Sequence, residues 1–228
     1  MDPIDGNMIK EIILKKITSG EIKPKQKIKQ NELANELGVS RTPIIKALNM
    51  LVAEGIVDNV PNSGYYIHQF SLREVAELFE VRQYIEMSAA ANAASLISED
   101  EIKYLHSFFS QYCPDMPIDK DSYYESDKGF HRYLRSFCRN KVLIRIENTL
   151  QIYERALSFG LIRKPADTLS EHIEIINAIE TRDPMLAKNK MMLHLEQSIT
   201  HLRSTVEQLG SIGIDPDTIH YQSLISEA

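Results

Sequence analysis

The chain has 228 residues, of which 43% are hydrophobic and 25% are charged, and its formal net charge is −6. This length allows two modest domains with cores of their own, and the composition is ordinary for a soluble globular protein. No apolar run is long enough to span a membrane, no secretion signal is recognisable, and two cysteines (Cys113 and Cys138) are too few for a disulfide framework, so we expect a cytoplasmic protein.

Residues 1–70 have the pattern of three helices followed by a β-hairpin. Isoleucines at helical spacing predict the first helix: Ile9, Ile12, Ile13 and Ile17. A second helix over residues 31–37 stops at Gly38, which can adopt the left-handed conformation that ends a helix. A third helix begins after Ser40, whose hydroxyl we expect to cap it, and Pro43 falls in its first turn.

The predicted hairpin begins after this third helix. Residues 54–60 indicate a helix stop and a short strand, residues 61–64 form a Pro- and Gly-containing turn, and residues 65–68 a second strand. Two helices joined by a Gly-containing turn, with Arg41 and Thr42 exposed in the first turn of the second, are typical of a DNA-binding helix-turn-helix. With the hairpin, the pattern predicts a winged helix. Its predicted DNA contacts are Ser40, Arg41, Thr42, Pro43, Lys46 and Gly64.

The run from residue 17 to residue 67, with Ser-Arg-Thr-Pro at 40–43 and Ala47-Leu48, resembles the DNA-binding domain of the GntR family of bacterial regulators. Family members usually carry Arg where this chain has Ile45, and Glu where it has Lys46. The resemblance implies that the missing Arg would contact DNA, so the operator sequence stays open. Lys46 can supply a phosphate contact, but it is a point charge and cannot replace a bidentate Arg.

The charge is divided unequally between the two parts of the chain. The first 70 residues carry nine basic and eight acidic side chains, a net of +1, and the remainder therefore carries −7. The lysines between residues 23 and 29 have no acid among them and form either a phosphate-contacting segment or a solvated loop. An acidic second domain suits a regulator whose other half binds DNA.

Residues 71–228 indicate an all-helical antiparallel bundle. Capping boxes at Ser71/Glu74 and Ser98/Glu101 and the pair Asp183-Pro184 mark helix starts. The expected helices cover residues 72–97, 99–109, 121–137, 141–161, 169–179 and 184–209, with a short one after Asp215. The sequence therefore predicts a mainly α protein, with a winged helix-turn-helix over residues 1–70 and a helical effector-binding and dimerisation domain over residues 71–228.

The bundle contains one set of residues with metal-binding chemistry. Asp127 and His131 are four residues apart and leave the same face of one helix, while His172 and His194 lie on two other helices among apolar neighbours. Imidazole and carboxylate together suit zinc, nickel, iron or manganese. Each histidine can instead be a hydrogen-bonded core residue, and the Asp/His pair can be a surface salt bridge. Spacing alone does not choose between His194 and His201.

The arrangement Asp127-x-x-Phe-His131, Glu-His172-x-x-Ile and Met-x-x-His194-Leu is similar to the FCD ligand-binding domain, which accompanies the FadR-type branch of the GntR family. The resemblance implies that these four residues hold a divalent metal, most simply zinc or nickel, and leaves His201 outside the set. It also implies that a small carboxylate effector binds at the metal. Arg82 is the candidate second anchor for that acid, with an internal ion pair to Glu86 as the alternative.

These expectations combine into one predicted function. A homodimer binds a double-stranded DNA operator, and a small organic acid bound at the metal and Arg82 releases it, so that the protein is a repressor and not an enzyme. Two alternatives stay open: a regulator that senses the metal itself, and a metal-dependent hydrolase with open water positions on the metal.

Overall fold

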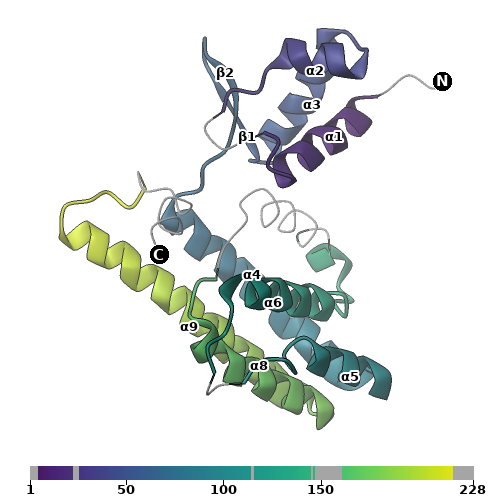
Figure 1. The fold of residues 1–228 in the computed structure, drawn as a ribbon, viewed down its shortest axis with the longest axis vertical. Coiled ribbons are helices and arrows are strands. Elements are labelled where there is room, and N and C mark those ends of the chain that lie inside the picture. The colour runs from purple at the N-terminus through teal and green to yellow at the C-terminus, as the bar shows by residue number, and fades with distance from the viewer. Residues whose placement is uncertain (1–4, 23–25, 114–115, 145, 147–160, 218–228) are drawn as a thin grey trace. The chain divides into compact units, whose positions relative to one another are not determined.

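A computed structural model describes residues 5–22, 26–113, 116–144, 146 and 161–217 (Figure 1). Its contacts separate a first unit, which ends at Phe70, from a second unit that begins at Ser71. The protein is mainly helical, with one two-stranded sheet among the described residues. None of the described helices is both long and apolar enough to cross a membrane.

The first unit is a winged helix-turn-helix. Its elements are α1 (Gly6–Thr18), α2 (Gln30–Leu37), α3 (Arg41–Ala53), β1 (Val57–Val60) and β2 (Gly64–Ile67). The strands pair antiparallel, with Val57 opposite Ile67 and Val60 opposite Gly64, and Asn62 in the turn takes a positive φ of 60°. Apolar residues of all five elements form the core: Ile9, Ile13, Leu33, Ile44, Leu48, Leu51, Val57 and Ile67.

The turn between α2 and α3 follows the sequence pattern except at its cap. Gly38 ends α2 in the left-handed conformation with φ of 64°, as predicted. Ser40 occupies the N-cap of α3, but its hydroxyl makes no capping hydrogen bond among the described residues, so that expectation was wrong. A capping hydroxyl bonds to the N–H of the second or third helical residue, and the third here is Pro43, which has no N–H.

The second unit is a helical bundle. It contains α4 (Leu72–Leu96), α5 (Glu99–Ser107), α6 (Lys120–Arg135), α8 (Pro165–Glu180) and α9 (Pro184–Ser211). Both predicted capping boxes are present, and Asp183 caps α9 by accepting from two backbone N–H groups. Helix α8 begins at Pro165, earlier than expected, because proline at the first helical position needs no N–H partner and starts a helix instead of breaking one.

Helix α4 is the centre of this bundle. It packs along α9 and also against α6 and α8 (Figure 1). Its buried alanines Ala89, Ala90, Ala93 and Ala94 leave room for neighbouring helices to approach closely. Helices α6, α8 and α9 therefore face one another around a shared interior. Most of the helix predicted over residues 141–161, and the short one after Asp215, lie outside the described residues.

Candidate functional site

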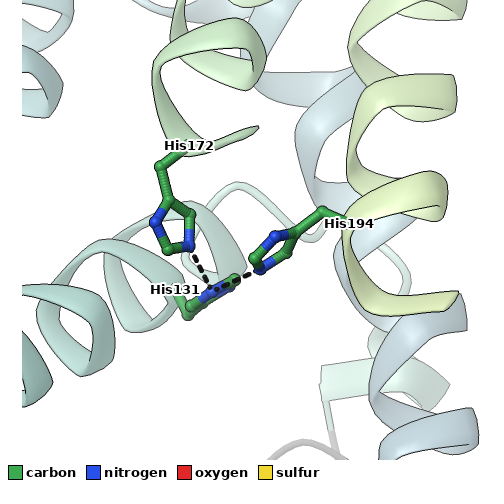
Figure 2. Close-up of side chains that lie close together, drawn as sticks. All are labelled: His131, His172 and His194. Atoms are coloured by element: carbon green, nitrogen blue, oxygen red, sulfur yellow. Dashed lines mark hydrogen bonds between the residues drawn. The ribbon is translucent and has the colours of Figure 1, made fainter. Parts of the chain in front are cut away.

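Three histidines from three different helices meet inside the bundle. His131 comes from α6, His172 from α8 and His194 from α9, and Figure 2 shows their rings converging on one point. Their side chains are 2%, 0% and 4% exposed. Each is placed by the apolar stripe of its helix, since the neighbouring buried residues Phe130, Ile176 and Leu195 fix which face points inward.

The spacing of the ring nitrogens fits a metal ion. His131 Nε2 lies 3.2 Å from His172 Nε2 and 3.3 Å from His194 Nε2. Since zinc binds imidazole nitrogen at about 2.0–2.1 Å, nitrogens on one tetrahedral ion are separated by about 3.3–3.4 Å. One donor atom from each of the three rings lies within 4.8 Å of the others. The three side chains are thus close to a coordinating arrangement.

The second nitrogen of each ring has a partner on the far side. His131 Nδ1 contacts Glu86 Oε2, His194 Nδ1 lies 2.7 Å from Glu171 Oε2, and His172 Nδ1 lies 3.0 Å from the hydroxyl of Tyr123. An ionised carboxylate only accepts, so Nδ1 of His131 and of His194 must carry the proton. In the neutral rings both Nε2 atoms then present lone pairs to each other at 3.3 Å. A cation between them would make that arrangement favourable.

Asp127 lies at the edge of the three-histidine cluster. Its Oδ1 is 3.3 Å from His172 Nε2 and 3.8 Å from His131 Nε2, and its side chain is 20% exposed. A carboxylate on this side is a candidate oxygen ligand beside the three nitrogens. His201, the residue that spacing alone could not separate from His194, is exposed on α9.

A second candidate surface lies in the first unit. Ser40, Arg41, Thr42 and Lys46 are exposed at the start of α3, while Pro43 in the same turn and Gly64 on the hairpin are half-buried. Arg41 Nε donates a 2.8 Å hydrogen bond to Gln30 Oε1, which holds the guanidinium beside α2. A hollow of about 640 Å³ is lined by the segment before α2, by α2 and α3, and by the hairpin.

Family models match most of the described chain. Residues 6–67 match the bacterial regulatory proteins of the gntR family, and residues 77–197, more than half of the chain, match the FCD domain. The chain belongs to the GntR family, with an FCD domain. It is a DNA-binding transcriptional regulator and not an enzyme, since the family and the relatives below are regulators.

Curated relatives of this GntR-family regulator cover most of its length. The HTH-type transcriptional repressor RspR of Escherichia coli is 27% identical over 84% of this chain and 86% of its own. A probable D-xylose utilization operon transcriptional repressor of Paenarthrobacter nicotinovorans is 24% identical over 91% of both chains. Two solved structures share the fold. E. coli McbR/YncC has a TM-score of 0.64 and 16% sequence identity, and the match covers 90% of this chain and 99% of that chain. A GntR regulator from Rhodococcus has a TM-score of 0.65 and 17% sequence identity, and the match covers 87% of this chain and 97% of that chain.

An ion pair holds the histidine-bound carboxylate of Glu171 in this GntR-family regulator. Arg163 donates through both terminal nitrogens to Glu171, and its Nε donates to the hydroxyl of Ser198 on α9. Burial alone would raise the pKa of the Glu171 carboxyl, but hydrogen bonds from Arg163 and His194 outweigh it and lower the pKa to about 2. Glu171 is therefore a fixed acceptor for His194.

Glu86 has the same role for His131. It is fully buried, and both Arg82 and Arg135 donate to its Oε1. Burial alone would raise the pKa of the Glu86 carboxyl, but Arg82, His131 and Arg135 hold it well below its usual range. The predicted effector anchor Arg82 thus makes the ion pair that the sequence offered as its alternative, and its guanidinium also lies over the ring of Phe79.

Burial also keeps the histidines ready to bind a cation. It lowers the pKa of His172 well below its usual value, and the neighbouring His194 and His131 add to this effect. The pKa of His194 is lowered for the same first reason, although the hydrogen bond to Glu171 opposes the shift. Neutral imidazoles carry the lone pair that a metal requires.

The sequence did not point to the residues that orient the histidines. Glu171 stands next to His172 in the chain, yet it serves His194 across the interface between α8 and α9. Tyr123 lies two turns before His131 on the same helix but contacts His172. Glu86 appeared only as a possible partner of Arg82. Such pairings depend on how the helices face one another. The sequence feature that could have indicated them is the presence of two glutamates and a tyrosine at inward-facing helix positions.

Proposed function

We propose that this GntR-family regulator is a repressor that is released from its operator by a small organic acid bound at a divalent metal, zinc or nickel, in the FCD domain. The observation that carries the proposal is the convergence of three buried Nε2 atoms at 3.2 and 3.3 Å, with the Nδ1 of every ring already engaged. Some FCD domains bind metal ions, in agreement with this donor set.

The proposed site consists of metal ligands and of residues that orient them. His131, His172, His194 and Asp127 would hold the ion, and their outer partners fix each ring so that its Nε2 faces inward. When bound, a divalent ion supplies positive charge and open coordination positions that suit a carboxylate. Three histidines are neutral and Asp127 contributes a single negative charge, so the occupied site would keep a net positive charge that attracts an organic anion.

Arg82 is the proposed second contact for the acid. Its Nε is paired with Glu86, which is also bound by Arg135 and His131. Because Glu86 has three cationic or hydrogen-bonding partners, it keeps two of them if Arg82 turns toward an effector carboxylate. Binding of the acid would in that case alter the contacts of α4 as well as those of the histidines.

DNA would be bound by the first unit of each subunit in a homodimer. Arg41 and Thr42 would enter the major groove with Ser40 and Pro43 at the helix start, and Lys46 would contact a phosphate. The hairpin with Gly64 would lie near the minor groove. Two such heads fit the half-sites of a near-palindromic operator. An effector releases DNA only to the extent that its affinity for the conformation that cannot bind DNA exceeds its affinity for the conformation that can. Two relatives named as repressors support release as the outcome.

Thermal unfolding of purified protein against a panel of small carboxylic and sugar acids, before and after chelation, tests the proposal. A ligand at one hundred times its Kd stabilises the folded state by about 2.7 kcal/mol, which is visible as a shifted midpoint. His194→Ala should lose both the metal and the acid response, while His201→Ala, an exposed histidine on the same helix, should keep them. Acids that stabilise chelated protein equally well would contradict the proposal.

The metal-sensing alternative differs in a measurable way. The histidines are almost fully buried, which favours a resident ion that exchanges slowly over a sensed one. If operator binding changes with the concentration of free zinc or nickel in the absence of any acid, the signal is the metal and not an organic acid. Operator binding that is unaffected by the metal alone supports the acid.

A further inference from the structure

An apolar side chain lies in the middle of the outward face of α3. The core of the first unit takes Ile44, Ala47, Leu48 and Leu51 from this helix, and Val52 packs against it. Ile45 is half-buried and belongs to neither group. Its side chain therefore contributes nothing to the described core, and its presence on this face needs another explanation.

The neighbours of Ile45 on the helix are polar and exposed. Thr42 lies three residues before it and Asn49 four residues after it, so the three side chains follow one stripe. Ile45 lines a hollow of about 470 Å³ with Thr42 and Asn49, and it also lines the hollow of about 640 Å³ that reaches the hairpin. It stands at the boundary of both hollows, at the centre of the surface that would meet DNA.

Two of the polar groups around Ile45 are held in place. Tyr65 on β2 donates a 2.7 Å hydrogen bond to Asn49 Oδ1. The amide oxygen of Asn49 is thus engaged, and its NH₂ group is the end left to serve as a donor. Reading adenine with Asn uses both the oxygen and the NH₂ group, and Tyr65 already occupies one of the two acceptor positions of the Asn49 oxygen. Arg41 is similarly directed by Gln30.

The chemistry of the major groove then identifies what Ile45 can contact. Guanine, cytosine and adenine present hydrogen-bonding groups and ring C–H atoms there, and thymine is the base that adds an apolar C5-methyl group. Packing a hydrogen-bonding edge against an isoleucine would leave that edge without its water partners, which is unfavourable. A methyl group against the isoleucine removes apolar surface from water on both sides.

We propose that Ile45 is a specificity-determining residue that packs on the methyl group of a thymine in each operator half-site. This inference rests on the proposed binding of DNA by α3 and adds the base that the centre of the helix selects. 5-Methylcytosine carries a methyl group at the same place in the groove, so the contact is with a 5-methylpyrimidine, and thymine is the source that unmodified DNA provides.

The test begins with the full-length protein and a library of randomised double-stranded DNA. Sequences retained by the protein define a consensus, and a synthetic consensus duplex is then made with each thymine replaced in turn by deoxyuridine, which lacks only the methyl group. Affinity is measured by fluorescence anisotropy at one fixed salt concentration, because protein–DNA affinity depends strongly on salt. We expect one position in each half-site at which deoxyuridine weakens binding about fourfold, the value of one buried methyl group.

Variants connect that position to Ile45. Ile45→Ala should bind the thymine and deoxyuridine duplexes equally well, and Ile45→Val should keep part of the difference. Lys46→Ala is the matched control from the next position of the helix. It should weaken both duplexes by the same factor and keep the full difference between them, since a contact to phosphate carries no base information. Circular dichroism confirms that each variant is folded.

The binding measurements can also overturn the assignment of Ile45. A consensus without a methyl-sensitive thymine, or a methyl effect of full size in Ile45→Ala, would overturn the assignment of Ile45 while leaving DNA binding intact. Replacing the sensitive thymine by cytosine should weaken binding, and 5-methylcytosine at that position should restore part of the loss. Failure of the wild-type protein to enrich any sequence would contradict the proposed function as well as this inference.

Discussion

Replacing Glu171 by glutamine should weaken metal binding without altering a single proposed ligand. Glu171 Oε2 accepts from His194 Nδ1 at 2.7 Å, and Arg163 binds both carboxylate oxygens. Glutamine has nearly the same shape, but it has no negative charge and one of its two terminal atoms cannot accept a hydrogen bond. His194 then keeps an acceptor only when the amide oxygen faces it, and that acceptor carries no negative charge, so the tautomer and the direction of its Nε2 are held less firmly.

The size of this effect follows from the behaviour of metal sites in general. Substitutions of residues that orient metal-bound histidines cost about 10–100-fold in metal affinity, or about 1.4–2.8 kcal/mol. The same change leaves Arg163, whose side chain is only 9% exposed, without its carboxylate. We therefore expect the free energy of unfolding to fall by about 1–3 kcal/mol as well. Metal binding must be measured at a temperature at which the variant is fully folded.

Glu174→Gln is the matched control for this prediction. Glu174 lies on the same helix, pairs with Lys190 at 2.7 Å, and has a side chain that is 57% exposed. Zinc affinity is measured for both variants by competition with a chromogenic chelator. Glu174→Gln should bind zinc as the wild type does. Wild-type affinity in a folded Glu171→Gln protein, or equal losses in the two variants, would refute the role given to Glu171.

The remaining predictions concern the ligands, one turn and the pH dependence. His172→Ala should lose stoichiometric metal while His201→Ala retains it, as measured by elemental analysis after gel filtration. Gly38→Ala should lower the free energy of unfolding by about 1 kcal/mol, because the φ of 64° at this position strains any residue with a Cβ. Gly210→Ala, in the helical conformation of α9, has no such strain and should raise the free energy of unfolding by up to about 1 kcal/mol. Urea unfolding measures both changes. In metal-free protein, the pKa of His172 and of His194 is below the unfolded value of 6.5, so the unfolded chain takes up protons first as the pH falls. The contribution of these two histidines to the free energy of unfolding should be constant above pH 6.5. Between pH 6.5 and pH 5 the free energy of unfolding should decrease by up to about 1.4 kcal/mol per pH unit for each histidine. A free energy of unfolding that does not change with pH, measured by urea unfolding, would contradict these shifts.

Much of the fold was predictable because its signals are local. Gly38, the two capping boxes and the Asp183-Pro184 start each act within a few residues of chain, and each is found where the sequence placed it. The errors were local too. Ser40 makes no capping hydrogen bond because Pro43 offers no N–H. Helix α8 begins before residue 169, the predicted start, because Pro165 is tolerated at the first helical position.

The candidate site was only partly predictable, for a different reason. The inward direction of His131, His172 and His194 follows from helical periodicity, but the meeting of their Nε2 atoms depends on the packing of α6, α8 and α9. Nothing in the spacing shows that Glu171 serves a histidine on another helix, or that Arg82 pairs with a glutamate bound to His131. These contacts are long-range, and a single sequence carries no record of them.

Operator release by small acids, measured as a function of bound metal, tests the proposed function most simply. The selected consensus duplex is titrated with the protein in three forms, zinc-loaded, chelated and His172→Ala, against the same panel of carboxylic and sugar acids. We predict at least one acid that releases DNA from the zinc-loaded protein and has no effect on the other two forms. Release that is the same in all three forms, or affinity set by zinc with no effect of any acid, would contradict it.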